Sequence, residues 1–294
     1  MPRVLIAGCG YVGRATAELF RANGWAVEGW TSSAESAAAL ADEPFAVRPV
    51  DITDAVAVGR AASEFGAVIQ CVSSGGGGAD AYRRIYLQGA RHLAAAFPTA
   101  LHLFTSSTSV YAQRDGEWVN EQSAAEPQRE TGKILRETEE LVLAGGGIVA
   151  RLAGIYGPGR SALLRKFLAG TAVISGDGTR YLNQVHRDDI AAALFLLVQR
   201  SLDARTDADA SVAGIFNVSD LKPMTERACY EWLATHLGRE LPPSSFAAAE
   251  RKRGNTNKRV SVDKLRARGW EPQFADFPAG MLRSVLLQLA LHGA

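Results

Sequence analysis

A chain of 294 residues, 47% of them hydrophobic, can bury a substantial core, which excludes a disordered tail and fits one large or two intertwined domains. With a formal net charge of +1 and no basic run longer than residues 251–253, it lacks the charge expected for binding nucleic acid or an anionic membrane. Its cysteines, Cys9, Cys71 and Cys229, lack CxxC or His-rich spacing, so we expect neither a disulfide framework nor a metal site.

The N-terminus and the apolar stretches bear on where the protein acts. Residues 1–3 run directly into a strand-like segment, which leaves no room for a signal peptide. The most apolar stretch, residues 190–198, is far too short to span a bilayer. Together with the scattered cysteines, these features predict a protein of the reducing cytoplasm without a membrane partner.

Strands and helices alternate along the first half of the chain. Apolar, strand-like runs occur at residues 4–7, 26–30, 45–50, 68–72, 101–105 and 148–152. Ala-rich segments with helical periodicity separate them. This alternation predicts an α/β fold of the doubly wound type, with a parallel sheet and helices on both faces.

The first strand leads through a glycine-rich turn into a helix over residues 14–22. In a turn of the form GxGxxG, Gly8 permits the tight turn, Gly10 lets the backbone approach a pyrophosphate, and Gly13 allows helix and strand to pack closely. The anion would bind to free N–H groups of the helix. Glycine-rich turns are common, but this one lies between an apolar strand and a helix, so it predicts a NAD(P) site.

Four further glycines, residues 75–78, follow the fourth predicted strand. Doubly wound folds bind their ligands at the carboxyl ends of such strands. The glycine run fits a flexible connector and a ligand-facing loop equally well.

After Pro158 the regular alternation fades. We expect helices at residues 163–168, 190–200 and 229–237, a strand at 215–218, and a loop rich in Pro, Ser and charge at 241–258. This change of pattern places a nucleotide-binding half before about residue 156 and a more irregular half after it.

Several segments carry a resemblance to a known family. They are residues 151–160 (RLAGIYGPGR), 176–178 (GDG) and 183–190 (NQVHRDDI), with residues 51–54, 105–111 and 214–220 in agreement. With these motifs nearly the whole chain resembles the extended short-chain dehydrogenase/reductases, the NAD(P)-dependent epimerase/dehydratase family. The resemblance implies a Rossmann-type domain of residues 1–156, to which residues 183–219 return, a smaller C-terminal α/β cap of residues 157–294, and a substrate between them.

The resemblance also implies which residues hold the cofactor. Asp51 would contact the adenine, whereas Asp54 is equally suited to cap a helix. The other residues implied are Gly8, Gly10, Tyr11, Val12, Gly13, Thr31, Ser32, Ser33, Ile52, Val72, Ser73, Ser74, Lys133 and Ile155. In this family His186 is chiefly architectural, and Asp188 or Asp189 can cap the helix that begins near residue 190.

The end of the second strand bears on the choice of cofactor. An acidic residue there would bind the ribose of NAD and repel the 2′-phosphate of NADP. Glu28 lies inside the predicted strand instead, and the strand ends at Thr31, Ser32 and Ser33. We therefore expect a modest preference for NADP, with NAD as the alternative.

The family's hydride chemistry uses a Ser, a Tyr and a Lys four residues after the Tyr, which lowers the pKa of the phenol. Ser107 falls on the Ser position, Lys133 falls on the Lys position with Glu137 in support, and Arg129 replaces the Tyr. A guanidinium stays charged and cannot shuttle a proton. The expected catalytic set of Ser107, Lys133 and Arg129 therefore lacks its usual proton carrier.

A phenol from another element, Tyr86 or Tyr111, is one replacement, although both also fit ordinary structural roles. Arg129, Lys133 and Glu137 would share one helix face, where like charges repel. Either Glu137 and the cofactor phosphates offset this repulsion, or an anionic substrate does so by pairing with Arg129.

Dehydratases of the family carry an Asp-Glu pair where this chain has Thr108 and Ser109, so dehydration is disfavoured. We expect an NADP-binding atypical reductase or epimerase acting on a small hydroxyl or carbonyl compound. The alternative is a non-catalytic NAD(P)-binding sensor or partner-binding protein. A homodimer is left open.

Overall fold

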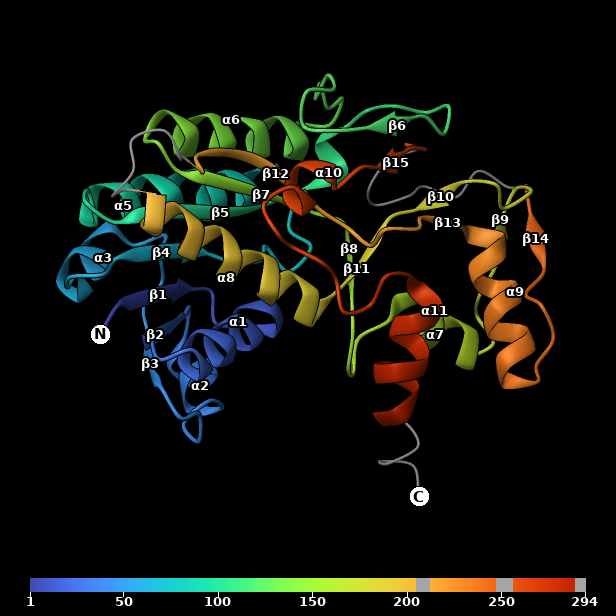
Figure 1. The fold of residues 1–294 in the computed structure, drawn as a ribbon, viewed down its shortest axis with the longest axis horizontal. Coiled ribbons are helices and arrows are strands. Elements are labelled where there is room, and N and C mark those ends of the chain that lie inside the picture. The colour runs from blue at the N-terminus through green and yellow to red at the C-terminus, as the bar shows by residue number, and fades with distance from the viewer. Residues whose placement is uncertain (205–211, 247–255, 289–294) are drawn as a thin grey trace. The chain divides into compact units, whose positions relative to one another are not determined.

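The computed structural model describes residues 1–204, 212–246 and 256–288 and divides the chain into two compact units (Figure 1). Unit 1 comprises residues 1–110, 125–151 and 190–216, and unit 2 comprises residues 111–124, 152–189 and 217–294. The predicted loop at 241–258 falls partly on residues 247–255, outside the described residues, as does the basic cluster at 251–253. The domain boundary near residue 156 stays a prediction.

Unit 1 is built around a seven-stranded sheet with the order β12-β7-β5-β4-β1-β2-β3. Its strands are β1 (Arg3–Ala7), β2 (Ala26–Thr31), β3 (Ala46–Pro49), β4 (Ala67–Gln70), β5 (Leu101–Ser107), β7 (Ile148–Leu152) and β12 (Gly214–Val218). All seven strands coincide with predicted ones, and the doubly wound α/β fold is confirmed. Strands β4 and β7 are buried along their whole length, which explains their high apolar content, and each also carries one buried polar residue, Gln70 in β4 and Arg151 in β7.

Helices cover the sheet of unit 1 on both faces. In Figure 1, α8 passes in front of the strands of unit 1 and α6 runs along the top of the view. The helical segments are α1 (Tyr11–Ala22), α2 (Ala34–Ala38), α3 (Ala55–Ala61), α4 (Ala79–Tyr82), η1 (Arg83–Gln88), α5 (Gly89–Ala96), η2 (Thr108–Val110), α6 (Glu130–Ala144) and α8 (Arg187–Asp203). The core packs Leu5 and Val68 of the sheet against Val58 of α3 and Leu93 of α5.

Unit 2 is more irregular, as the fading pattern predicts. Its strands form the two-stranded pairs β10 (Tyr181–Leu182) with β13 (Met224–Thr225), β8 (Gly154–Tyr156) with β11 (Gln184–His186), β9 (Ile174–Ser175) with β14 (Ser244–Ser245), and β6 (Trp118–Val119) with β15 (Arg259–Val260). Its helices are α7 (Ala162–Leu168), α9 (Glu226–Leu237), α10 (Asp263–Arg266), α11 (Phe277–Gly280) and η4 (Met281–Val285). Tyr156, Phe167, Tyr230 and Phe277 form the centre of its core.

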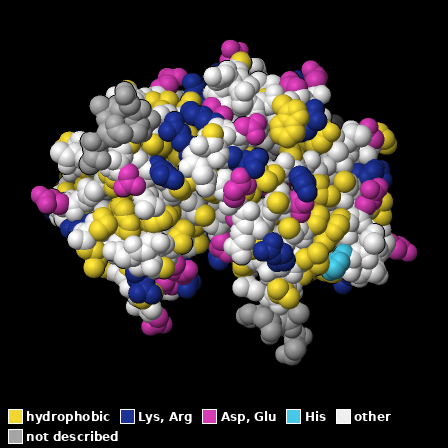
Figure 2. Space-filling model, viewed as in Figure 1, with side chains coloured by type: hydrophobic (Ala, Val, Ile, Leu, Met, Phe, Trp, Pro, Cys, Tyr) yellow, Lys and Arg dark blue, Asp and Glu magenta, His cyan; other side chains and the backbone are white. Residues whose placement is uncertain are grey.

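Within the described ranges, no helix combines the length and the apolar character that crossing a membrane requires. On the face drawn in Figure 2, acidic and basic side chains are interspersed with uncharged ones. This mixture accords with the small net charge of the whole sequence.

Candidate functional site

The segments predicted to hold a cofactor follow five neighbouring strands of the sheet. Parallel pairing joins β5 to β4, β4 to β1, β1 to β2 and β2 to β3. Because these strands run in the same direction, their carboxyl ends meet at one edge of the sheet. Ser107, Val72, Gly8, Thr31 and Asp51 stand at or just beyond those ends, so the fold brings these predicted residues to the edge where doubly wound sheets bind ligands.

Gly8 makes the turn from β1 to α1 and cannot carry a side chain. Its φ of 98° lies in the left-handed region. A Cβ on Gly8 would also stand 2.6 Å from the backbone nitrogen of Val72, so the segment that follows β4 passes directly beside the turn. The tight turn therefore requires glycine at this position for two independent reasons.

Gly13 and Gly10 meet opposite surroundings. A Cβ on Gly13 would overlap the carbonyl oxygen of Gly8 and lie 3.1 Å from Cγ2 of Ile6, so α1 packs against the turn itself. A Cβ on Gly10 would meet no atom within 4 Å. Gly10 is exposed and directly precedes α1, whose N-terminus has no side-chain cap. Of the next two residues, Tyr11 is half-buried and Val12 is buried. The open space over Gly10 leaves room for a ligand on the helix N-terminus.

The hydroxyls after β2 are largely engaged in local contacts. Thr31 donates from Oγ1 to the carbonyl of Ser33 at 3.1 Å, and Oγ of Ser33 accepts the N–H of Ser36 and caps α2. Ser32 is exposed, and its hydroxyl bonds to no described residue. Glu28 lies inside β2, as expected, where its carboxylate accepts hydrogen bonds from the indole of Trp30 at 2.7 Å and from Arg48 at 3.1 Å.

The segment after β3 separates the roles of its two carboxylates. Asp54 accepts the N–H groups of Val56 and Ala57 and caps α3, which confirms the helix-cap interpretation of this residue. Asp51 accepts the N–H of Thr53 at 2.9 Å and is half-buried, while the adjoining Ile52 is buried. Asp51 thus remains the acidic residue at the sheet edge.

Tyr86 supports the loop after β4. Its phenol oxygen accepts the N–H of Ser74 at 3.2 Å, and its ring packs edge-on against Tyr82 and Phe104. Burial raises the pKa of this phenol, which opposes any role as a base near neutral pH. Ser73 accepts the N–H of Gly75 at 3.3 Å, so the loop is held by its own hydroxyls as well. These contacts favour the structural interpretation of Tyr86.

Arg129 does not share a helical face with Lys133 and Glu137, so this expectation is wrong. Helix α6 begins at Glu130, and Arg129 precedes it with an extended backbone at φ −88° and ψ 143°. The carbonyl of Arg129 instead accepts the N–H of Lys133 at 3.1 Å, as a residue at the N-cap position does.

The charges near Lys133 are balanced by protein side chains. Lys133 is exposed, and its Nζ lies 3.9 Å from a carboxylate oxygen of Glu130. Arg83 donates to Glu130 at 3.2 Å and to Glu137 at 3.1 Å, so Glu137 pairs with Arg83 rather than with Lys133. Ser107 is half-buried at the end of β5, where its Oγ accepts the N–H of Ser109.

Unit 1 contains a buried ionic cluster that the amino-acid sequence does not predict. Glu139 is fully buried, and its carboxylate accepts hydrogen bonds from Ser106 at 2.6 Å and from Arg151 at 3.0 and 2.6 Å, as well as from Arg136. Arg151 is itself only 1% exposed. In the sequence, Glu139 reads as one of several charges on a solvated helix, and no local signal marks it as buried.

Two of the residues singled out in the sequence, Tyr111 and Ile155, lie in unit 2. Tyr111 is buried, and its hydroxyl donates to Oδ1 of Asn217 at 2.9 Å, so this phenol is engaged. Its carbonyl accepts from Nζ of Lys258 at 3.0 Å. Ile155, predicted at the cofactor, lies in β8 of unit 2 and is half-buried.

Neither Asp188 nor Asp189 caps the helix that follows them, so the predicted cap is wrong. Helix α8 begins earlier, at Arg187, and the imidazole Nδ1 of His186 accepts the N–H of Asp188 at 3.2 Å. The carboxylate of Asp189 instead accepts the N–H groups of Gln273 and Phe274 at 2.6 and 3.1 Å. These contacts tie the chain near α11 to the start of α8.

The contacts of His186 give a pH prediction. Because Nδ1 accepts a hydrogen bond, Nε2 carries the proton and donates to Ser284 at 2.9 Å, which is the neutral tautomer. Burial lowers the pKa of His186 to about 4, although the carboxylate of Asp188 opposes this shift. The lowered pKa contributes stability above the unfolded-state value of 6.5 that is lost as the pH falls towards 4.

Asp189 affects stability with the opposite pH dependence. Burial raises the pKa of its carboxyl to about 6, so its contribution to stability is lost as the pH rises through 6. The two effects oppose each other in global unfolding between pH 4 and 6, so a residue-specific measurement is needed. In NMR titration, the His186 resonance, assigned with His186→Asn, should show a midpoint near 4. A midpoint of 6 or above would contradict the buried neutral tautomer.

Comparisons with known proteins agree with this fold. The model of the NAD dependent epimerase/dehydratase family matches residues 4–217. Protein YeeZ of Escherichia coli K12 is 30% identical over 258 residues, which cover 82% of this chain and 86% of YeeZ.

Two solved structures are similar to this chain over nearly the whole length of both proteins. A dTDP-glucose 4,6-dehydratase from Bacillus anthracis, in complex with NAD, has a TM-score of 0.80 at 15% identity and covers 99% of this chain and 97% of its own. A UDP-glucose 4-epimerase from Thermus thermophilus, also with NAD, has a TM-score of 0.77 at 21% identity, with 95% and 96% covered. At these identities the likeness shows a shared fold.

Proposed function

The chain belongs to the NAD dependent epimerase/dehydratase family, and on that premise we propose that it binds NADP at the turn between β1 and α1. We further propose that it acts as an atypical reductase or epimerase on a small hydroxyl or carbonyl compound. The glycine turn carries the first part of this proposal. Gly8 and Gly13 leave no room for side chains, whereas the space over Gly10 is open to a ligand. NAD is the cofactor named in the two similar solved structures and is the alternative here.

The preference for NADP rests on the end of β2. The described residues at the strand end, Thr31, Ser32 and Ser33, carry no carboxylate that would repel a 2′-phosphate. Glu28 is held by Trp30 and Arg48 inside the strand. The exposed hydroxyl of Ser32 is the group best placed in the sequence to receive the phosphate.

Ser32→Asp should therefore weaken NADP binding by about fivefold or more, since two like charges near 4 Å repel by ~1 kcal/mol even in water. NAD binding should change less. Calorimetric titration of both cofactors checks this, with Ser63→Asp, an exposed serine after α3, as the matched control. Tighter binding of NAD than of NADP to the unchanged protein would overturn the preference.

The proposed chemistry uses Ser107 to orient a substrate hydroxyl or carbonyl and Lys133 to hold the nicotinamide ribose. The exposed Nζ of Lys133 is only loosely paired with Glu130, which leaves its three donors available. Arg129 precedes the same helix and cannot shuttle a proton, so we assign it instead to an anionic group of the substrate.

Lys133→Met should weaken NADP binding about tenfold, the contribution of one hydrogen bond from a charged donor. Ser107→Ala should leave NADP binding intact and reduce only turnover. The control is Lys166→Met, an exposed lysine on α7. Equal cofactor affinity of the unchanged protein and Lys133→Met would remove Lys133 from the site.

The second candidate function is a non-catalytic NAD(P)-binding sensor. It is favoured by the absence of a Tyr at position 129 and by the engagement of the phenols of Tyr86 and Tyr111 in structural hydrogen bonds. Incubation of NADPH with a panel of aldehydes and ketones separates a reductase from a sensor. A reductase oxidises NADPH in the presence of at least one carbonyl compound, whereas a sensor binds NADPH and leaves it unchanged.

A further inference from the structure

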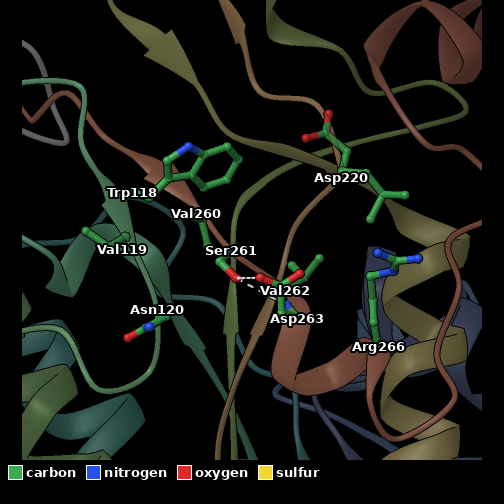
Figure 3. Close-up of a pocket in the computed structure, with 10 residues that line it drawn as sticks. Trp118, Val119, Asn120, Asp220, Val260, Ser261, Val262, Asp263 and Arg266 are labelled. Atoms are coloured by element: carbon green, nitrogen blue, oxygen red, sulfur yellow. Dashed lines mark hydrogen bonds between the residues drawn. The ribbon is translucent and has the colours of Figure 1, made fainter.

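Unit 2 contains a pocket of about 500 Å³ that no part of the proposed function uses (Figure 3). The pocket lies where β6 pairs with β15, beside α10 and the segment that follows β12. Ten residues line it: Trp118, Val119, Asn120, Asp220, Leu221, Val260, Ser261, Val262, Asp263 and Arg266. Five of these side chains are apolar, so the pocket combines an apolar wall with a few polar groups, as small-molecule sites do.

Asp220 is the unusual member of this lining. It is only 2% exposed, and its Oδ1 is buried without a hydrogen-bond partner among the residues that the structure describes. Burial, and then repulsion from Asp276 and Asp189, raises the pKa of Asp220 well above its usual range. A buried carboxyl oxygen without a partner is costly, and a ligand that donates to it would recover that cost.

The cations near the pocket are engaged elsewhere. Arg266 donates to Glu271 at 3.1 and 2.8 Å. Arg259, which precedes Val260 in the same strand, donates to the carbonyl of Gly116 at 2.7 Å and stacks on Trp118. Asp263 adds a second carboxylate to the lining, where it accepts the hydroxyl of Ser261 at 2.8 Å. Asp263 has the guanidinium of Arg266 nearby, whereas the charges of described residues that act on Asp220 are those of Asp276 and Asp189.

Trp118 supplies a surface for the rest of a ligand. Its ring is 52% exposed even though the guanidinium carbon of Arg259 stands 5.1 Å from the ring centroid. The contact with the guanidinium of Arg259 restrains the indole, whose exposed surface can then pack against the apolar part of a bound molecule. Val260 and Leu221 extend the apolar lining.

We propose that this pocket binds a small organic cation, a primary amine on an apolar body, with the ammonium at Asp220 and the body against Trp118. The ammonium supplies the hydrogen-bond donor that Oδ1 lacks, and its positive charge lowers the raised pKa of the carboxyl and favours the ionised form. None of the residues proposed to hold NADP belongs to the pocket, so this site is independent of the proposed function.

Titration calorimetry with phenethylamine tests the proposal, and 2-phenylethanol serves as the uncharged probe of similar shape. Phenethylamine should bind at least about tenfold more tightly than the alcohol, since hydrogen bonds between charged groups are the stronger ones. Asp220→Asn should remove most of this difference. Trp118→Ala, a change at an exposed side chain, should weaken both probes. Asp42→Asn, an exposed aspartate in unit 1, is the matched control and should change neither.

Equal binding of amine and alcohol to the unchanged protein would overturn the proposal, and this comparison needs no variant to fold. Unaltered phenethylamine affinity in folded Asp220→Asn would also overturn it, because the amine would then bind elsewhere. The NADP titrations are separate measurements, so either proposal can fail without the other.

Discussion

Glu139→Gln is expected to lower the free energy of unfolding by about 3–5 kcal/mol, the usual cost of removing one partner from a buried ion pair. The substitution keeps the size of the side chain and removes its charge. Arg151, 1% exposed, would then be a buried cation that has lost the carboxylate to which it makes two hydrogen bonds. Urea unfolding measured by circular dichroism checks the loss.

Glu140→Gln is the matched control, because Glu140 is the next residue of the same helix and is 66% exposed. Its contact with Arg136, at 3.4 Å, is a surface ion pair, so we expect a change of less than about 1 kcal/mol. Similar losses in both variants would show that burial does not distinguish the two carboxylates. The double variant Glu139→Leu/Arg151→Met removes both buried charges and should recover part of the stability.

Gly10→Ala is expected to leave the stability of the protein unchanged and to weaken NADP binding about 10- to 100-fold, from the ~1–3 kcal/mol that an extra methyl costs in a filled site. In the protein without cofactor, a Cβ at Gly10 meets no atom within 4 Å, and its φ of −94° suits any residue. The methyl group would instead occupy the space proposed for the pyrophosphate. Thermal unfolding and NADP titration of the same variant check both parts.

Gly13→Ala should differ by losing stability as well as NADP affinity, because its Cβ would overlap the backbone of Gly8. We expect a destabilisation of ~1–3 kcal/mol as α1 moves away from the turn. Gly59→Ala, in α3 with open space around it, is the control and should raise stability by ~0.5–1 kcal/mol without changing NADP affinity. If Gly10→Ala binds NADP normally, the cofactor does not lie over this turn.

The strands of the large sheet and the glycine turn follow from the amino-acid sequence alone. A parallel strand covered on both faces is mostly apolar, and the short runs of β1, β4 and β7 show this locally, with Arg151 in β7 as a buried exception. Gly8 and Gly13 are needed for local reasons, a left-handed φ and a helix packed on its own turn, so their spacing alone identified them. Asp54 as a cap is likewise a contact within three residues.

The partners of the buried polar groups depend on the three-dimensional fold. Glu139 meets Ser106 and Arg151 across 33 and 12 residues of sequence, and Asp189 meets Gln273 across 84, so no local pattern encodes these contacts. Asp189 was predicted as a cap because its neighbours suggest one, but the backbone of a distant segment competes for the same carboxylate. Asp220 ends one of the segments that carry the family resemblance, but its burial and the missing partner of its oxygen among the described residues are tertiary properties that no local pattern encodes.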